Sequence, residues 1–142
     1  EVAINKTIER GGSVLIPAFA VDRTEVILVQ LRELMESGKI PRIPVYADSP
    51  MALRALAFYR QAINESSPEI RTEIVEKWKN KDPFSTGTLV ELTSVDESKT
   101  INDPQQPCII ISASGIHADT VAFGVPNPSL QAARRAHCLA RR

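Results

Sequence analysis

The sequence predicts an α/β fold in which a mostly parallel sheet of about four or five strands has helices on both faces. Four short apolar runs, at residues 14–16, 45–48, 88–93 and 108–112, alternate with longer segments whose apolar residues recur at helical spacing. Helix start signals follow directly after these runs. Apolar strands that alternate with helices are typical of a parallel sheet that is buried on both faces.

The first strand and the helix after it form the first α/β unit. Pro17 is expected to end the strand, because proline has no N–H for the next hydrogen bond. Asp22 is expected to cap the following helix, with Glu25 three residues later as in a capping box. This helix is expected to end near Ser37, and its apolar stripe is predicted at Ile27, Leu31 and Leu34, with Leu28 and Met35 beside it.

Start signals repeat further along the chain. Ser49 and Pro50 mark a helix that begins after the second strand, with serine as cap and proline at the first helical position. Residues 67–69 read Ser-Pro-Glu and predict another helix in the same way. Ser94 and Glu97 form a capping-box pattern after the third strand. The run at residues 108–112 is the most apolar of the four, and its Cys108 is expected in the core.

Composition excludes several classes of protein. The 142 residues contain 17 Lys plus Arg and 17 Asp plus Glu, so binding of nucleic acid through a large excess of positive charge is excluded. No run approaches about 18 apolar residues, which argues against a membrane span. The chain opens with charged residues and no leader pattern. Two cysteines make no disulfide framework, and the expectation is a cytoplasmic protein with reduced thiols.

Polar residues converge at one edge of the predicted sheet. In a parallel sheet the carboxyl ends of all strands lie at the same edge, where open α/β proteins usually bind ligands. Helices that start near Asp22, Ser49 and Ser94 direct partial positive charge there, which suits phosphate, although helix capping alone explains these three residues. Arg23 lies beside this edge, where it is placed to reach a phosphate or to pair with Asp48.

No catalytic set or metal-ligand pattern is present in the sequence. His117 and His137 stand alone, and no H-x-H-x-D-H cluster, P-loop or G-x-S-x-G elbow occurs. The sequence therefore predicts no catalytic and no metal-ligating residues in this chain.

Four motifs resemble the β-CASP domain, which is inserted in metallo-β-lactamase-fold RNA-processing nucleases such as ribonuclease J and the cleavage and polyadenylation endonuclease. Residues 12–23 are similar to the family's G-x-V-L-I-P-A-F-A-V-G-R segment, and residues 43–52 to its I-P-V-Y-x-D-S-P-M-A. Residues 94–102 resemble S-x-E-E-S-K-x-L-N, and residues 109–115 match I-I-I-S-A-S-G. The order and spacing of the motifs also agree with the family.

Two departures from the family pattern stand out. The family has glycine where this chain has Asp22. After Gly115 the family continues with methionine and Gly-Gly-Arg, whereas this chain does not. We therefore expect a β-CASP domain over residues 1–115, as part of a larger metallo-β-lactamase-fold protein, and a divergent Arg-rich tail, helical or disordered, over residues 116–142.

The resemblance implies a function for the whole protein and a smaller part for this chain. Zinc ligands belong to the flanking metallo-β-lactamase domain, so this stretch is expected to hold no cofactor and to hydrolyse no RNA alone. The β-CASP side of the cleft contacts single-stranded RNA through its phosphate backbone, and the positions carried over as substrate contacts are Arg23, Ser49, Ser114 and Gly115.

The expected function is thus the substrate-clamping domain of a zinc-dependent RNA-processing nuclease. Two alternatives stay open: a non-catalytic scaffold subunit of an RNA-processing complex, and a free-standing nucleotide-binding α/β module. The expected partners are single-stranded RNA, the flanking metallo-β-lactamase domain and a second copy in a homodimer, with no membrane.

Overall fold

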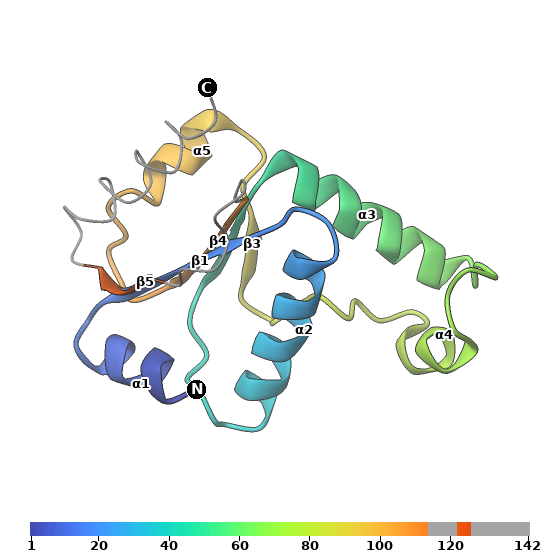
Figure 1. The fold of residues 1–142 in the computed structure, drawn as a ribbon, viewed down its shortest axis with the longest axis horizontal. Helices are drawn as coiled ribbons and strands as arrows, with labels where there is room; N and C mark the ends of the chain where they lie inside the picture. The colour runs from blue at the N-terminus through green and yellow to red at the C-terminus, as the bar shows by residue number, and fades with distance from the viewer. Residues whose placement is uncertain (114–121, 126–142) are drawn as a thin grey trace.

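The computed structural model describes residues 1–113 and 122–125 and has the predicted α/β architecture (Figure 1). Helices and strands alternate along most of the chain. In order they are α1 (Val2–Glu9), β1 (Ser13–Ala18), α2 (Arg23–Glu36), β2 (Val45–Asp48), α3 (Pro50–Asn64), α4 (Thr72–Trp78), β3 (Leu89–Glu91), α5 (Val95–Thr100), β4 (Ile109–Ala113) and β5 (Ala122–Val125).

The described strands form one sheet in the order β3-β2-β4-β1-β5. The first four pair in parallel, with Val14 and Val45 both aligned with Ile109 of the central strand β4. β5 pairs antiparallel to β1 at one end of this order. The predicted fold class, a mostly parallel sheet of about four or five strands, is confirmed; the sequence motifs did not predict the antiparallel strand β5.

The sheet is packed on both faces. Along β4 the side chains alternate: Ile109 and Ile111 belong to one core cluster, and Ile110 belongs to the other. The larger cluster adds buried residues from α1, α2 and α3, among them Leu28 and Leu56. The smaller cluster contains Leu15, Leu92, Ile101 and the fully buried Cys108, so the prediction that Cys108 lies in the core is confirmed.

The structure corrects the predicted end of the first strand. β1 continues through Pro17 to Ala18, and Pro17 is aligned with Ser112 of β4. Val14 donates its N–H to the carbonyl of Cys108, the residue just before β4, so the N–H groups of alternate residues point toward β4. The N–H that Pro17 lacks would face the β5 side, and the described pairing with β5 ends at Leu15. Proline is tolerated there because no ladder hydrogen bond is lost.

The predicted helix start at residues 67–69 is wrong. α4 begins only at Thr72, and the Ser67 hydroxyl donates to the Glu69 carboxylate within a turn. The backbone N–H of Ser67 bonds to the Ala62 carbonyl, and that of Ser66 bonds to the Ile63 carbonyl. These bonds close the end of α3, so this serine terminates one helix and does not start the next.

The buried stripe of α2 is also rotated relative to the prediction. Leu28, Leu31 and Met35 are the buried apolar residues, whereas Ile27 and Leu34 are only partly buried. Helix geometry allows both stripes, and packing on the sheet selects one. Within the described part of the chain, no helix has the length and hydropathy that a bilayer crossing requires.

Candidate functional site

The candidate site is the edge of the sheet at which the four parallel strands end. The loops after β1, β2 and β3 lead there into α2, α3 and α5 (Figure 1). Three residues of interest therefore lie at one edge: Arg23 at the start of α2, Ser49 before α3 and Ser94 before α5. Ser114 and Gly115, the other two predicted contacts, lie outside the described residues.

The loop after β1 is held by two side-chain hydrogen bonds. Thr24 Oγ1 donates to the carbonyl of Phe19 at 2.9 Å. Tyr59 Oη, from the middle of α3, donates to Asp22 Oδ1 at 2.6 Å. This bond to a carboxylate raises the pKa of Tyr59 to about 12, with burial and the nearby charges adding to the effect. The loop is thus tied to two helices at its end.

The sequence predicted that the Asp22 side chain caps α2, and this prediction is wrong. Asp22 occupies the N-cap position, but its carboxylate makes no cap hydrogen bond and turns instead to Tyr59. Its φ of 68° lies in the left-handed region that favours glycine. This conformation explains why the family pattern has glycine at this position. The bond from Tyr59 helps to hold an aspartate in a conformation that an L-residue rarely adopts.

Glu25 is the most unusual charged residue near this edge. It is 6% exposed, and neither carboxylate oxygen has a hydrogen-bond partner among the described residues. Burial raises its pKa above the usual value, the nearby Asp22 carboxylate adds to the rise, and the amides of Glu25 and Asp22 oppose it in part. The sequence placed Glu25 in a capping box, but the pattern could not indicate this burial.

Glu25→Gln is expected to raise the melting temperature near neutral pH. Between the unfolded-state pKa of about 4.5 and the higher folded-state pKa, the folded protein binds more protons than the unfolded chain. The stability that Glu25 contributes is therefore present below pH 4.5 and is lost as the pH rises through the folded-state pKa. Glutamine carries no such proton, so the gain in the variant should grow across this window.

Melting curves of the variant and the wild type from about pH 4 to pH 8 test this expectation. Glu33→Gln, at an exposed position of the same helix, is the matched control and should change stability by no more than about 0.5 kcal/mol. A melting temperature of Glu25→Gln that stays at or below the wild-type value throughout would contradict it.

Arg23 is exposed and makes no ion pair with Asp48, so that predicted alternative is wrong. Its backbone N–H bonds to the carbonyl of Val21, which fixes the start of the helix. The ion pairs formed within residues 1–113 do not use its guanidinium. The charge of Arg23 is thus presented to solvent at the edge of the sheet.

The predicted caps at Ser49 and Ser94 are confirmed, but the two helix starts differ in the polar groups around them. Ser49 is buried, and its Oγ accepts the N–H of Ala52 at 3.2 Å; α3 has no acidic residue in its first turn. Ser94 forms a complete capping box with Glu97. The Glu97 carboxylate accepts the N–H groups of Thr93 and Ser94 and the Thr93 hydroxyl, and these bonds lower its pKa.

These contacts reduce the number of helix ends that suit an anion. The amides of Thr93 and Ser94, just before α5, are already bonded to the chain's own Glu97 carboxylate. The start of α2 carries two carboxylates, those of Asp22 and Glu25. Of the three helices that begin at this edge within the described part of the chain, only α3 has a first turn without an acidic residue. The edge therefore offers one helix N-terminus and the guanidinium of Arg23.

The described residues do not fit a zinc site. Across residues 1–113 and 122–125, no group of three or more His, Cys, Asp or Glu side chains is arranged to hold a metal ion.

Comparison with known protein families identifies the family of this chain. The family model described as the Beta-Casp domain matches residues 24–119. The chain belongs to the β-CASP domain family. The resemblance to the β-CASP family is thereby confirmed, and the match spans three of the four motifs, at residues 43–52, 94–102 and 109–115.

Several curated proteins are similar to this β-CASP chain. It is 35% identical over 115 residues to a ribonuclease of Thermus thermophilus, covering 81% of this chain and 26% of that protein. It is 39% identical over 113 residues to an RNase J-like protein of Methanocaldococcus jannaschii, covering 80% and 24%. It is 34% identical over 116 residues to the transcription termination factor FttA of Methanosarcina mazei, covering 82% and 18%. The chain thus spans about a quarter or less of the length of these relatives.

Two features of this edge were missed by sequence reasoning. The bond between Asp22 and Tyr59 joins residues 37 positions apart, and no local pattern indicated a contact between them. The burial of Glu25 depends on how α2 packs. The one available signal was the family's glycine at position 22, which marks a left-handed backbone.

Proposed function

We propose that this β-CASP chain clamps single-stranded RNA in a zinc-dependent RNA-processing nuclease, with zinc held by a flanking metallo-β-lactamase domain. Two of its relatives are named as a ribonuclease and an RNase J-like protein, which supports an RNA substrate. The observation that carries the proposal is the exposed guanidinium of Arg23 at the edge where the parallel strands end. A free arginine in this position suits a phosphate oxygen.

The surroundings of Arg23 support contact with a strand and with a second domain. The N-terminus of α3 adds partial positive charge without a competing acidic residue in its first turn. Four large apolar side chains on the loops and helix starts of this edge are between 48% and 73% exposed: Phe19, Val21, Met51 and Val95. Exposed apolar side chains gathered at one edge favour burial against another protein surface. We infer that the flanking metallo-β-lactamase domain covers them.

Arg23→Ala is expected to weaken binding of oligouridylate about two- to ten-fold, because one solvated phosphate contact is lost. The salt dependence should fall by about one phosphate equivalent. Fluorescence anisotropy with labelled oligouridylate over a range of salt concentrations measures both quantities. The melting temperature should change little, since the Arg23 guanidinium is exposed and outside the ion pairs of the described residues.

Arg10→Ala is the matched control. Arg10 is also exposed, but it follows α1 at the opposite edge of the sheet, just before β1. Its replacement should leave affinity and salt dependence unchanged. Equal affinities of wild type and Arg23→Ala, or equal losses in both variants, would refute the assignment of this edge to RNA.

A further inference from the structure

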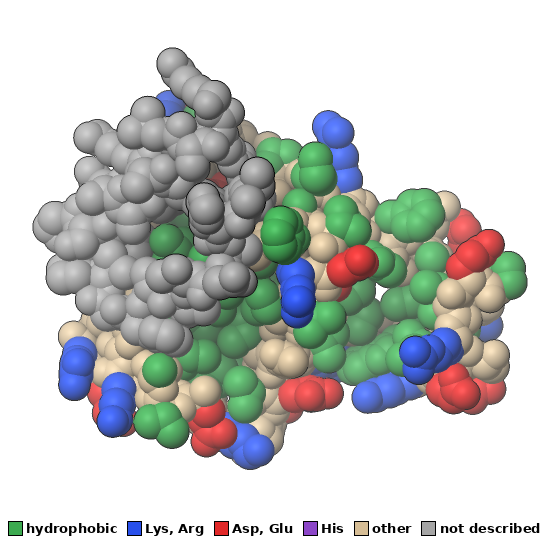
Figure 2. Space-filling model, viewed as in Figure 1, with side chains coloured by type: hydrophobic (Ala, Val, Ile, Leu, Met, Phe, Trp, Pro, Cys, Tyr) green, Lys and Arg blue, Asp and Glu red, His purple; other side chains and the backbone are tan. Residues whose placement is uncertain are grey.

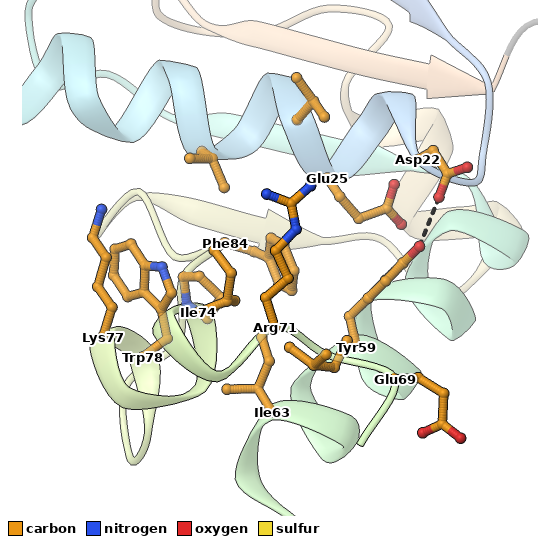
Figure 3. A pocket seen from close by; sticks show the side chains of 14 residues that line it. Asp22, Glu25, Tyr59, Ile63, Glu69, Arg71, Ile74, Lys77, Trp78 and Phe84 are labelled. Carbon is orange, nitrogen blue, oxygen red and sulfur yellow. Dashed lines mark hydrogen bonds between the residues drawn. The ribbon is translucent and has the colours of Figure 1, made fainter. Parts of the chain in front are cut away.

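A groove lies beside the edge at which the parallel strands end, which we call the RNA edge because of the function proposed for it. The groove is bounded by the start of α2, the middle of α3 and the segment from Glu69 through α4 (Figure 3). Its volume is about 480 Å³, which is in the range of cavities that hold small ligands or a few side chains. We call it the α2–α4 groove. Its apolar wall includes Val26, Ile63 and Ile74, of which Val26 and Ile74 are 49% and 40% exposed.

The charges around the groove are unevenly distributed. Asp22 and Glu25 lie at one end, and Lys77 and Trp78 lie at the other (Figure 3). Glu25 takes part in none of the ion pairs formed by the described residues, although it is 94% buried. Arg71 extends from the turn before α4 toward α2 (Figure 3), and its guanidinium forms none of the ion pairs between the described residues. A buried carboxylate without a hydrogen bond in the described residues is costly, and a cation brought to it would lower that cost.

The surface around the groove has the character of a protein-binding site. Apolar side chains gather over the α2, α3 and α4 side of the molecule, with acidic and basic side chains around them (Figure 2). Such a patch with a charged rim is typical of a surface that receives a partner segment. The apolar wall would receive aliphatic or aromatic side chains, and the acidic end would fix the position of a basic one.

RNA fits this groove less well than a polypeptide does. The carboxylates of Asp22 and Glu25 oppose a phosphate. Trp78, the largest aromatic side chain of the groove, is already engaged: the Arg32 guanidinium lies 4.6 Å and the Lys77 ammonium 4.9 Å from its ring centroid. Stacking of a base on this indole would displace a cation.

We propose that the α2–α4 groove binds a segment of a protein partner in which apolar residues are adjacent to a lysine or arginine. The apolar side chains cover Val26 and Ile74, and the cationic group pairs with Glu25. This surface is separate from the exposed guanidinium of Arg23, so the proposal does not depend on RNA binding.

Selection from a displayed library of random peptides against the whole chain tests the proposal. Enriched peptides are expected to share a basic residue next to apolar residues. The same peptides, synthesised and titrated by calorimetry, should bind Glu25→Gln at least ten-fold more weakly than wild type. Loss of affinity would not reflect unfolding, because Glu25→Gln is expected to be at least as stable as wild type.

Three further variants make the test specific. Ile74→Glu changes the exposed apolar wall and should also abolish binding, whereas Glu33→Gln, elsewhere on α2, should not change it. Arg23→Ala should retain full peptide affinity, which separates this surface from the RNA edge. The proposal is overturned if no peptide is enriched over selection on Ile74→Glu, if enriched peptides bind Glu25→Gln as tightly as wild type, or if oligouridylate displaces them.

Discussion

Leu56→Ala is expected to lower the free energy of unfolding by about 2–5 kcal/mol, the largest effect of the substitutions considered. Leu56 is fully buried in α3 and belongs to the larger core cluster, with Leu28 of α2 and Val45 of β2. Removing its isopropyl group loses the transfer free energy of those atoms and leaves a cavity, because the sheet cannot move to fill the space.

Urea unfolding followed by circular dichroism measures this effect. A loss of about 3 kcal/mol corresponds to a fall in melting temperature of roughly 9–15 °C in a domain of this size. Phe58→Ala is the matched control, since Phe58 lies on the same helix and is 71% exposed. It should change the free energy of unfolding by no more than about 0.5 kcal/mol. Similar losses in the two variants would show that α3 does not pack as described.

Arg60→Ala is expected to cost about 2 kcal/mol, the second largest effect. The Arg60 guanidinium joins two segments: Nη2 lies 2.8 Å from Asp82 Oδ2, and Nη1 lies 2.7 Å from Glu91 Oε1 of β3. Burial of this side chain lowers its pKa, but the bonds to the two carboxylates outweigh burial and raise it. The side chain is 25% exposed, so solvent screening keeps the expected loss below that of a fully buried pair.

Replacing Arg60 should loosen the structure locally as well as lower the free energy of unfolding. Asp82 also accepts the backbone N–H of Phe84 at 2.9 Å, which holds the segment between α4 and β3. Hydrogen exchange at the Phe84 amide is therefore expected to accelerate in Arg60→Ala. Arg54→Ala, at an exposed position of the same helix, is the control and should leave both exchange and stability unchanged. An Arg60→Ala protein as stable as Arg54→Ala would refute a structural role for this cluster.

Local patterns in the sequence determined the α/β architecture and the two serine caps at the edge where the parallel strands end. The apolar run at residues 108–112 predicted a strand, because a strand buried on both faces is apolar at successive positions. The caps at Ser49 and Ser94 were predicted because a serine cap acts within its own helical turn. The four motifs were sufficient to indicate the β-CASP family, since each lies in one continuous segment.

Only the tertiary structure decided which polar groups remain free. Asp22 gives up capping because Tyr59, 37 residues away, lies within hydrogen-bonding distance of it. Glu25 loses water because α2 packs with its Leu28 face against the sheet, and helical periodicity alone does not fix that rotation. Pro17 stays within a strand because its missing N–H faces the side where the described β5 pairing has ended. Each outcome depends on groups distant in sequence, which a local pattern cannot encode.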